Sequence, residues 1–184
     1  MFTGIVQAVG RIVRLDPLEI DCAGLDLADV AVGDSIAVQG VCLTVTSVTG
    51  KGFTADVSAE TRKVTTGLER AGGAVNLEKS LALGDKLGGH LVAGHVDGIG
   101  EVLSLKEGVL RVCVPHELAR YVARKGSICI DGVSLTVNRV EGDAFEVQLI
   151  PHTLDVTTLG GLRAGGKVNL EVDLIARYVE RMMT

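Results

Sequence analysis

The chain has 184 residues, of which 47% are hydrophobic, and its 18 basic and 23 acidic side chains give a net charge of −5. The basic residues are scattered and form no stripe, so nucleic acid is excluded as an expected partner. No apolar run approaches the roughly 20 residues of a membrane helix, and the N-terminus lacks the features of a signal peptide. The four cysteines show no C-x-x-C spacing, so we expect reduced thiols in a cytoplasmic protein.

Alternating apolar and polar residues, rich in β-branched side chains and separated by Gly-rich turns, predict short strands along most of the chain. In the first half the predicted strands are Ile5–Leu15, Ser35–Val38, Leu43–Val48, Phe53–Val57 and Ala74–Leu77. In the second half they are Val96–Leu105, Val109–Val114, Ser127–Ile130, Leu135–Val140, Ala144–Ile150 and Lys167–Val172. About six strands per half, without long alternating helices, predict an all-β fold of two small Greek-key barrels.

Two helices are predicted in the second half. Pro115 suits the first turn of a helix that extends to Arg124, and Asp173 is a good N-cap for a helix that continues to the C-terminus. The C-terminal helix has one apolar stripe, formed by Leu174, Ile175, Tyr178, Val179, Met182 and Met183. This stripe either packs against its own barrel or contacts another subunit, and we favour the subunit contact because the barrels are already complete without it.

The chain contains one sequence twice. Residues 35–48 (SIAVQGVCLTVTSV) and 127–140 (SICIDGVSLTVNRV) agree at eight of fourteen positions with an offset of 92. Further matches join residues 4–7 with 94–97 and residues 75–78 with 168–171. A period near ninety residues is too long for a solenoid repeat and is the size of a small domain. We therefore predict one barrel at 1–90, a second barrel at 91–172 and a helix at 173–184.

The two copies differ at positions where chemistry is done. From the first copy to the second, the changes are Ile5 to His95, Gln39 to Asp131, Cys42 to Ser134, Asp56 to Gln148 and Glu60 to His152. The second copy thus gains His95 and Asp131, residue types that transfer protons near neutral pH, although a core histidine is the plainer interpretation of His95. His90 and His95 have no carboxylate cluster beside them, so no metal site is predicted. A duplicated fold with unequal polar groups suggests two copies of one substrate that are treated differently.

The motifs resemble those of the riboflavin synthases. The matching segments are Met1–Gln7, Gly40–Thr46, Gly88–Gly98, Lys125–Ser127, Asp131–Val137, Leu149–Thr153 and Val168–Asp173. The resemblance implies dismutation of two molecules of 6,7-dimethyl-8-ribityllumazine in the last step of riboflavin biosynthesis. One lumazine donates a four-carbon unit to the other, which yields riboflavin and 5-amino-6-(D-ribitylamino)uracil. It implies neither a metal nor a separate cofactor.

The resemblance also implies an assembly. The family forms homotrimers with the C-terminal helices at the centre, and each reaction site lies between the first barrel of one subunit and the second barrel of a neighbour. The small-molecule substrate is the lumazine, and lumazine synthase is a candidate protein partner. A non-catalytic alternative stays open, because the same fold occurs in lumazine-binding antenna proteins, which lack the set His90, His95, Asp131 and Ser134.

Carried over by position, the resemblance assigns one pocket to each copy. The residues of the first pocket are Phe2, Gly4, Ile5, Val6, Ser35, Cys42, Leu43, Thr44, Asp56, Val57, Ser58, Ala59, Glu60 and Thr61. The residues of the second pocket are Gly94, His95, Val96, Lys125, Ser134, Leu135, Thr136, Gln148, Leu149, Ile150, Pro151, His152 and Thr153, with Lys125 supplied by an adjacent subunit. Backbone amides with Thr44 and Thr136 are expected to hold the pyrimidine edge, and polar groups including Lys125 the ribityl hydroxyls.

Five residues are candidate catalytic groups, namely His95, Ser134, Asp131, Cys42 and His90. His95 is the first candidate for taking the proton from the 7-methyl group of one lumazine. Ser134 with Asp131, Cys42 or a bound water would supply or position the nucleophile that adds to the other lumazine. Holding the two rings face to face is expected to contribute about 7–11 kcal/mol through orientation alone.

Overall fold

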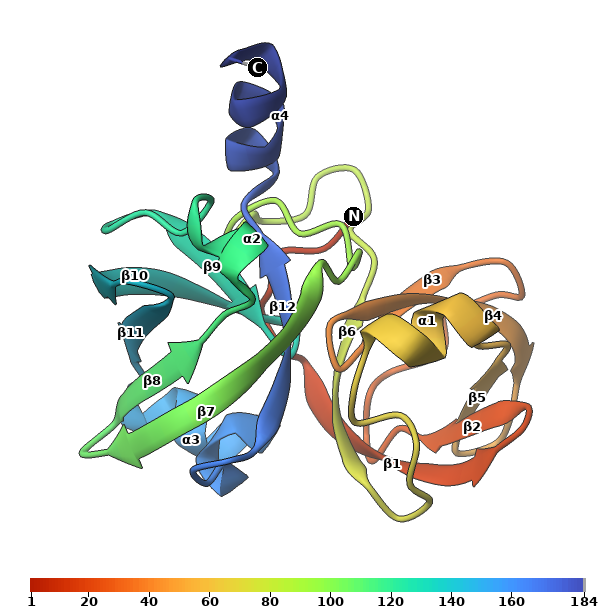
Figure 1. Ribbon diagram of the computed structural model, residues 1–184. Helices are drawn as coiled ribbons and strands as arrows, with labels where there is room; N and C mark the ends of the chain where they lie inside the picture. Colours follow the sequence, from red (N-terminus) through yellow and green to blue (C-terminus); the bar gives the residue numbers. More distant parts are fainter. Residues whose placement is uncertain (184) are drawn as a thin grey trace.

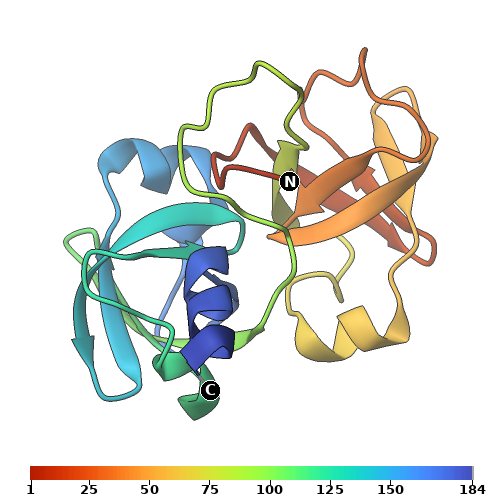
Figure 2. The same cartoon turned by 90° about the horizontal axis from the view of Figure 1, so that it is seen from above.

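The computed structural model describes residues 1–183 and contains two closed antiparallel β-barrels, which lie side by side in both views (Figure 1 and Figure 2). The first barrel is built from β1 (Ala8–Leu15), β2 (Leu18–Asp21), β3 (Ser35–Val38), β4 (Val41–Val48), β5 (Gly52–Ala55) and β6 (Ala74–Lys79). The second is built from β7 (Gly98–Lys106), β8 (Val109–Cys113), β9 (Ser127–Ile130), β10 (Val133–Glu141), β11 (Ala144–Gln148) and β12 (Lys167–Val172). The predicted pair of six-stranded barrels is confirmed.

The two barrels have the same topology. Their strand rings are β1-β2-β5-β4-β3-β6 and β10-β11-β8-β7-β12-β9, which coincide when each strand of the first is advanced by six. Both rings bend at equivalent bulges, which increase local twist and help a sheet to close. In β4 the register shifts between Val45 and Ser47, and in β10 it shifts between Val137 and Arg139. The duplication in the sequence is therefore a duplication of the three-dimensional fold.

The interior of each barrel is occupied by its own cluster of buried apolar side chains. Phe53 in the first barrel and its counterpart Phe145 in the second are both essentially inaccessible to solvent. Along β4 and β10 buried and exposed residues alternate, which turns Cys42, Thr44, Ser134 and Thr136 to the outer surface. Ligand-binding groups on these strands consequently act from outside the barrels.

Several predicted element boundaries are wrong. Strand β2 was not predicted, because it is only four residues long and carries two acidic residues. The strands predicted at Phe53–Val57 and Ala144–Ile150 end earlier, and short helices follow them. These helices, α1 (Ala59–Val64) and α3 (Pro151–Val156), were also not predicted. Six residues are too few for the helical period to show in a sequence.

The remaining helices belong to the second half of the chain. The helix predicted from Pro115 to Arg124 is only α2 (His116–Ala119), and a short 3-10 turn spans Thr158–Gly161. The C-terminal helix α4 (Leu174–Met183) projects away from the barrels (Figure 1). Within residues 1–183, no helix is both long enough and apolar enough to cross a membrane.

A symmetric hydrogen-bond network joins the two barrels. Asn76 Nδ2 donates to the carbonyl of Asp131, and its counterpart Asn169 Nδ2 donates to the carbonyl of Gln39. A Cβ atom built on Gly40 would lie 2.7 Å from the backbone nitrogen of Gly132. The paired glycines therefore serve the close approach of one barrel to the other.

Candidate functional site

The segments that precede the two barrels exchange places. We call Thr3–Val6 the first lead-in and Ala93–Val96 the second lead-in. The backbone N–H of Cys42 in the first barrel donates to the carbonyl of Gly94 at 2.8 Å, and the N–H of Ser134 in the second barrel donates to the carbonyl of Gly4 at 2.8 Å. The hydrophobic contacts agree, since Val6 packs against the core of the second barrel and Val96 against that of the first.

This exchange corrects the grouping predicted from the sequence. That grouping placed Gly4–Val6 with Cys42–Thr44 and Gly94–Val96 with Ser134–Thr136, one set per copy. In the structure Gly94 lies on Cys42 and Gly4 lies on Ser134, so each candidate pocket takes residues from both copies. We call them the first-barrel pocket, around Cys42, and the second-barrel pocket, around Ser134. Immediately before the two lead-ins, Phe2 and Val92 pair in an antiparallel bridge.

The second-barrel pocket contains a serine–histidine pair. Ser134 Oγ and His90 Nδ1 are hydrogen-bonded at 2.7 Å. Burial lowers the pKa of His90, although the negative charge of Asp173 opposes this, so its imidazole is neutral near pH 7. His90 Nε2 is buried and has no hydrogen-bond partner within residues 1–183, which leaves a polar atom for a bound molecule or water to satisfy.

The first-barrel pocket contains the other two candidate groups. Cys42 is half-buried at the position equivalent to Ser134, and a Cβ atom built on Gly94 would lie 2.6 Å from Cys42 Cβ. His95, the next residue along the second lead-in, is exposed. The exchange thus gives one histidine to each pocket, with His95 near Cys42 and His90 on Ser134. The sequence prediction had placed both His95 and Ser134 in one pocket.

Asp131 lies in the interface between the barrels. Its side chain is 2% exposed, and its Oδ1 accepts the backbone N–H of Asn169 at 2.8 Å. Gln39, at the equivalent position, accepts the N–H of Asn76 through Oε1 in the same way. Burial raises the pKa of Asp131 to about 7. Within the described chain no hydrogen bond joins its carboxylate to His95 or Ser134, so the geometry gives it a place in the interface network.

Two equivalent turns contain the other predicted binding segments. Asp56–Thr61 leads into α1, where the Ser58 hydroxyl accepts the N–H of Thr61, and Gln148–Thr153 leads into α3, where Pro151 occupies the first turn. The Thr65 hydroxyl donates to the carbonyl of Thr61, as Thr157 does to Thr153. The predicted binding residues Leu43, Leu135 and Leu149 have buried side chains. They can therefore offer only backbone atoms to a ligand.

The other predicted binding residues have different surroundings. Phe2 is completely buried and packs with Val92 and Cys129. Its side chain therefore stabilises the lead-ins and is not available to a ligand. Ser35 is paired with Thr44 across β3 and β4, close to the first-barrel pocket. Lys125 is exposed, and its backbone N–H donates to the carbonyl of Val137. Within residues 1–183, its ammonium group forms no ion pair or hydrogen bond that would fix its position.

Comparison with known proteins identifies the family. The sequence pattern of the lumazine-binding domain matches residues 3–80 and again residues 93–173. The chain belongs to the lumazine-binding domain family. It is 50% identical to a riboflavin synthase of Mycobacterium bovis over 100% of this chain and 98% of that protein. It is 43% identical to a riboflavin synthase of Photobacterium phosphoreum over 100% of this chain and 89% of that protein.

Solved structures of this family share the architecture. A structure of LumP complexed with 6,7-dimethyl-8-(1'-D-ribityl) lumazine superimposes with a TM-score of 0.83 at 26% identity, covering 94% of this chain and 99% of that one. LumP complexed with riboflavin gives a TM-score of 0.84 at 28% identity over the same fractions. Both bound molecules named there contain a ribityl chain on a fused heterocycle.

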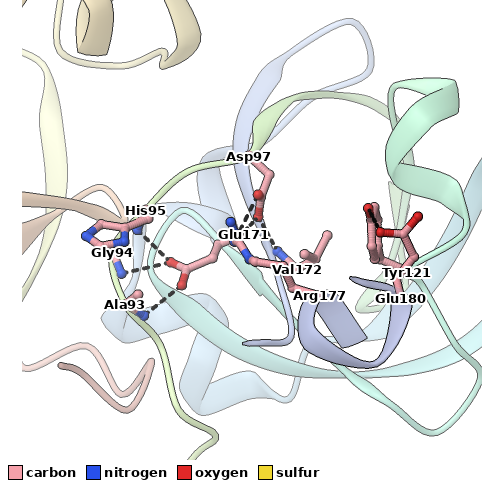
Figure 3. Close-up of polar contacts among 9 residues, drawn as sticks. All are labelled: Ala93, Gly94, His95, Asp97, Tyr121, Glu171, Val172, Arg177 and Glu180. Carbon is pink, nitrogen blue, oxygen red and sulfur yellow. Dashed lines mark hydrogen bonds and ion pairs between the residues drawn. The ribbon is translucent and has the colours of Figure 1, made fainter. Parts of the chain in front are cut away.

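The structure also reveals polar residues that the sequence prediction missed. Glu171 on β12 accepts hydrogen bonds from the backbone of Ala93, Gly94 and His95 (Figure 3). Glu78 on β6 holds the first lead-in in the same manner. The motif Val-Asn-Leu-Glu, which occurs in both copies and supports the repeat and the family resemblance, is the sequence signal for these two glutamates.

Two further acidic residues connect the second lead-in with α4. Asp97 accepts the N–H of Val172 at 2.8 Å and forms an ion pair with Arg177 of α4 at 2.9 Å (Figure 3). Burial raises the pKa of Asp97, although Arg177 opposes the rise. Asp173, predicted only as an N-cap, accepts the N–H of Ile175 and also acts electrostatically on His90. The start of α4 is therefore tied to both pockets.

Proposed function

We propose that the protein is a riboflavin synthase that converts two molecules of 6,7-dimethyl-8-ribityllumazine to riboflavin and 5-amino-6-(D-ribitylamino)uracil. The observation that carries the proposal is a pair of equivalent pockets with unlike polar groups, His90 with Ser134 in one and His95 with Cys42 in the other. A dismutation needs the same substrate bound twice and treated differently. The likeness to riboflavin synthases over the full chain supports this reaction.

In the second-barrel pocket, Ser134 acts on one lumazine. Neutral His90 accepts the serine proton through Nδ1, which makes Oγ a better nucleophile toward the electron-poor ring or a better anchor for an attacking water. The 2.7 Å contact is within the range for such a proton transfer. The low pKa of His90 suits a base that must be neutral before the reaction begins.

In the first-barrel pocket, His95 acts on the other lumazine. Its exposed imidazole is free to approach the 7-methyl group and remove a proton, which is acidic because the resulting anion delocalises into the ring. Cys42 contributes its half-buried thiol at the base of the same pocket. Backbone amides of the lead-ins with Thr44 and Thr136 hold the pyrimidine edges, and Lys125 holds ribityl hydroxyls.

We propose that three chains assemble around their α4 helices. The supporting observation is the apolar face of α4, because Ile175, Tyr178 and Val179 are 68%, 63% and 48% exposed. The helix is held to its own barrel by polar contacts instead, including Tyr121 Oη to Glu180 and Arg177 to Asp97 (Figure 3). An exposed apolar face of this kind marks an association site. Assembly would bring the first-barrel pocket of one subunit against the second-barrel pocket of its neighbour.

We also propose a cytoplasmic location, where lumazine synthase would supply the substrate directly. The support for this location is that Cys22, Cys42, Cys113 and Cys129 are all unpaired, as is usual in reducing compartments. Co-sedimentation of the purified protein with lumazine synthase tests the partnership. If the two proteins sediment separately, the proposed partnership is contradicted, and the proposed reaction is not affected.

The decisive experiment supplies the lumazine as sole substrate and follows riboflavin absorbance near neutral pH with a chelator present. We expect one riboflavin for every two lumazines consumed. A second candidate function is a lumazine carrier without turnover, favoured by the likeness to LumP. Tight binding with an unchanged lumazine spectrum would establish the carrier and remove the catalytic roles of His95 and Ser134.

A further inference from the structure

Two buried glutamates occupy equivalent places beside the lead-ins. Glu78 at the end of β6 is 4% exposed, and Glu171 at the end of β12 is 3% exposed. A carboxylate is rarely buried unless its charge is satisfied. Within residues 1–183 neither forms an ion pair with a basic side chain at the distance of a salt bridge. Their negative charge is instead satisfied by backbone N–H groups.

The contacts of Glu171 all go to one lead-in. Its Oε1 accepts the N–H of Ala93 at 2.7 Å, and its Oε2 accepts those of Gly94 at 2.9 Å and His95 at 3.1 Å (Figure 3). Three consecutive N–H groups thus converge on one carboxylate, as they do in anion-binding backbone nests. Because Glu171 belongs to β12, the second barrel fixes the shape of a segment that lies on the first.

Glu78 repeats this arrangement on the first lead-in. Its Oε1 accepts both the N–H and the hydroxyl of Thr3 at 2.7 Å, and its Oε2 accepts the N–H of Gly4 at 3.0 Å. The N–H of Ile5 donates to the Thr3 hydroxyl at 3.2 Å, and the backbone of Ile5 also opposes the rise in the pKa of Glu78. The equivalent His95 donates directly to Glu171. In both copies, therefore, consecutive backbone N–H groups of a lead-in surround one buried glutamate.

We propose that Glu171 and Glu78 are positioning residues, each of which sets the backbone of the lead-in that receives one lumazine. Glu171 serves the first-barrel pocket, since Gly94 lies on Cys42, and Glu78 serves the second-barrel pocket, since Gly4 lies on Ser134. The proposal rests on the proposed function, because it assumes that these pockets bind lumazine. Because Glu171 accepts the backbone N–H of His95, it also fixes the position from which the His95 side chain extends.

A glutamine cannot replace either glutamate in this role. Both carboxylate oxygens accept hydrogen bonds, whereas an amide offers one acceptor and turns an NH2 group toward the N–H that faced the other oxygen. For Glu171→Gln this leaves Ala93, or Gly94 and His95, without an acceptor. Leaving a buried N–H group without an acceptor is costly, and the lead-in avoids that cost by moving. Lumazine affinity of the corresponding pocket is then expected to fall by about tenfold or more.

The test is a titration of the full-length protein with the lumazine, followed by NMR of carbon-13-labelled histidines. His95 reports on the first-barrel pocket and His90 on the second-barrel pocket. We expect Glu171→Gln to weaken the transition seen at His95 and to leave that at His90 near wild type, and Glu78→Gln to do the reverse. Glu101→Gln is the matched control, because Glu101 is exposed and forms a surface ion pair with Lys167, and both transitions should stay unchanged.

Equal losses at both histidines in either variant, or unchanged affinities at both, would overturn the proposal. If a glutamine variant does not fold, Thr3→Val tests the same contacts from the lead-in, since it removes the hydroxyl that donates to Glu78 and accepts the N–H of Ile5. It should weaken the His90 transition alone, and no change there would also overturn the proposal. A wild-type protein that shows no transition at either histidine would instead refute lumazine binding itself.

Discussion

The backbone N–H of Cys42 donates to the carbonyl of Gly94, a residue that precedes the other barrel. Its symmetric partner contact joins Ser134 to Gly4. Each pocket is therefore shared by both copies of the repeat, and neither barrel could form its pocket alone. This explains why two small barrels remain in one chain, with Phe2 and Val92 paired between them.

A substitution at Gly94 tests the exchange of lead-ins. Gly94 has a φ of +77°, and an added Cβ would lie 2.6 Å from Cys42 Cβ. We expect Gly94→Ala to weaken lumazine binding at the first-barrel pocket by at least tenfold, measured by fluorescence titration. Gly84→Ala is the control, because Gly84 has a φ of +98° but open space around it. It should cost about 1–2 kcal/mol of stability through its positive φ alone and leave affinity unchanged, and equal effects on affinity would contradict the contact.

The hydrogen bond between His90 and Ser134 predicts non-additive losses of activity. Because the two side chains act as one unit, His90→Ala and Ser134→Ala should each lower kcat by about 100-fold, in the range of acid–base catalysis. The double variant should lose little more. Asn138→Ala, at an exposed site on the same strand, should retain wild-type kcat. Losses that multiply in the double variant would show that the residues act independently.

His95 is expected to affect turnover more than binding. His95→Ala should reduce the rate of riboflavin formation far more than it reduces lumazine affinity, because the exposed imidazole acts in proton transfer. His116→Ala serves as control, since that histidine is exposed on the second barrel and bonded to Asp143. Single-turnover absorbance and equilibrium titration separate the two quantities. Equal losses of both would remove the catalytic role of His95.

The buried carboxyl of Asp131 predicts a pH dependence of stability. Because burial raises its pKa to about 7, the folded protein holds this proton more tightly than the unfolded chain. The contribution of Asp131 to stability is thus fully present below about pH 4 and is lost as pH rises toward 7. Asp131→Asn keeps an oxygen for the N–H of Asn169 and should flatten this decline, leaving the variant up to about 4 kcal/mol more stable at pH 7.

Urea unfolding of both proteins between pH 4 and 7 measures this difference. Glu78, Glu171 and Asp97 also have pKa values raised by burial, and their contributions decline with pH in the same direction. They are present in both proteins and cancel when the two profiles are subtracted. Parallel profiles would mean that Asp131 does not titrate in this range. Loss of turnover with unchanged lumazine affinity would restore Asp131 as a candidate catalytic group.

The apolar face of α4 predicts that assembly and activity are lost together. Val179 is 48% exposed on the projecting helix, so Val179→Asp should convert the assembly to smaller species in sedimentation velocity and abolish riboflavin formation. Arg181→Gln changes the charge by the same amount at another exposed position of the helix, and it should preserve both. A smaller species with full activity would show that each pocket pair is completed within one chain.

The sequence by itself determined the tandem barrels, the equivalence of the two pockets and most of their residue types. These follow from period-2 alternation and from an internal repeat, both of which can be read locally, as the match of β4 with β10 illustrates. Elements such as β2 and α1 could not be predicted in this way, because they are too short to show a period.

Only the tertiary structure decided which lead-in serves which pocket. A repeat with two-fold symmetry is equally compatible with Gly4 on Cys42 or Gly4 on Ser134, since both arrangements repeat the same contact twice. The packing of the barrels, through Asn76 and Asn169, selects the second. For the same reason the pairing of His90 with Ser134, 44 residues apart, and the burial of Asp131 in the interface could not be predicted. Contacts between distant segments depend on how complete domains pack, and no local pattern encodes that.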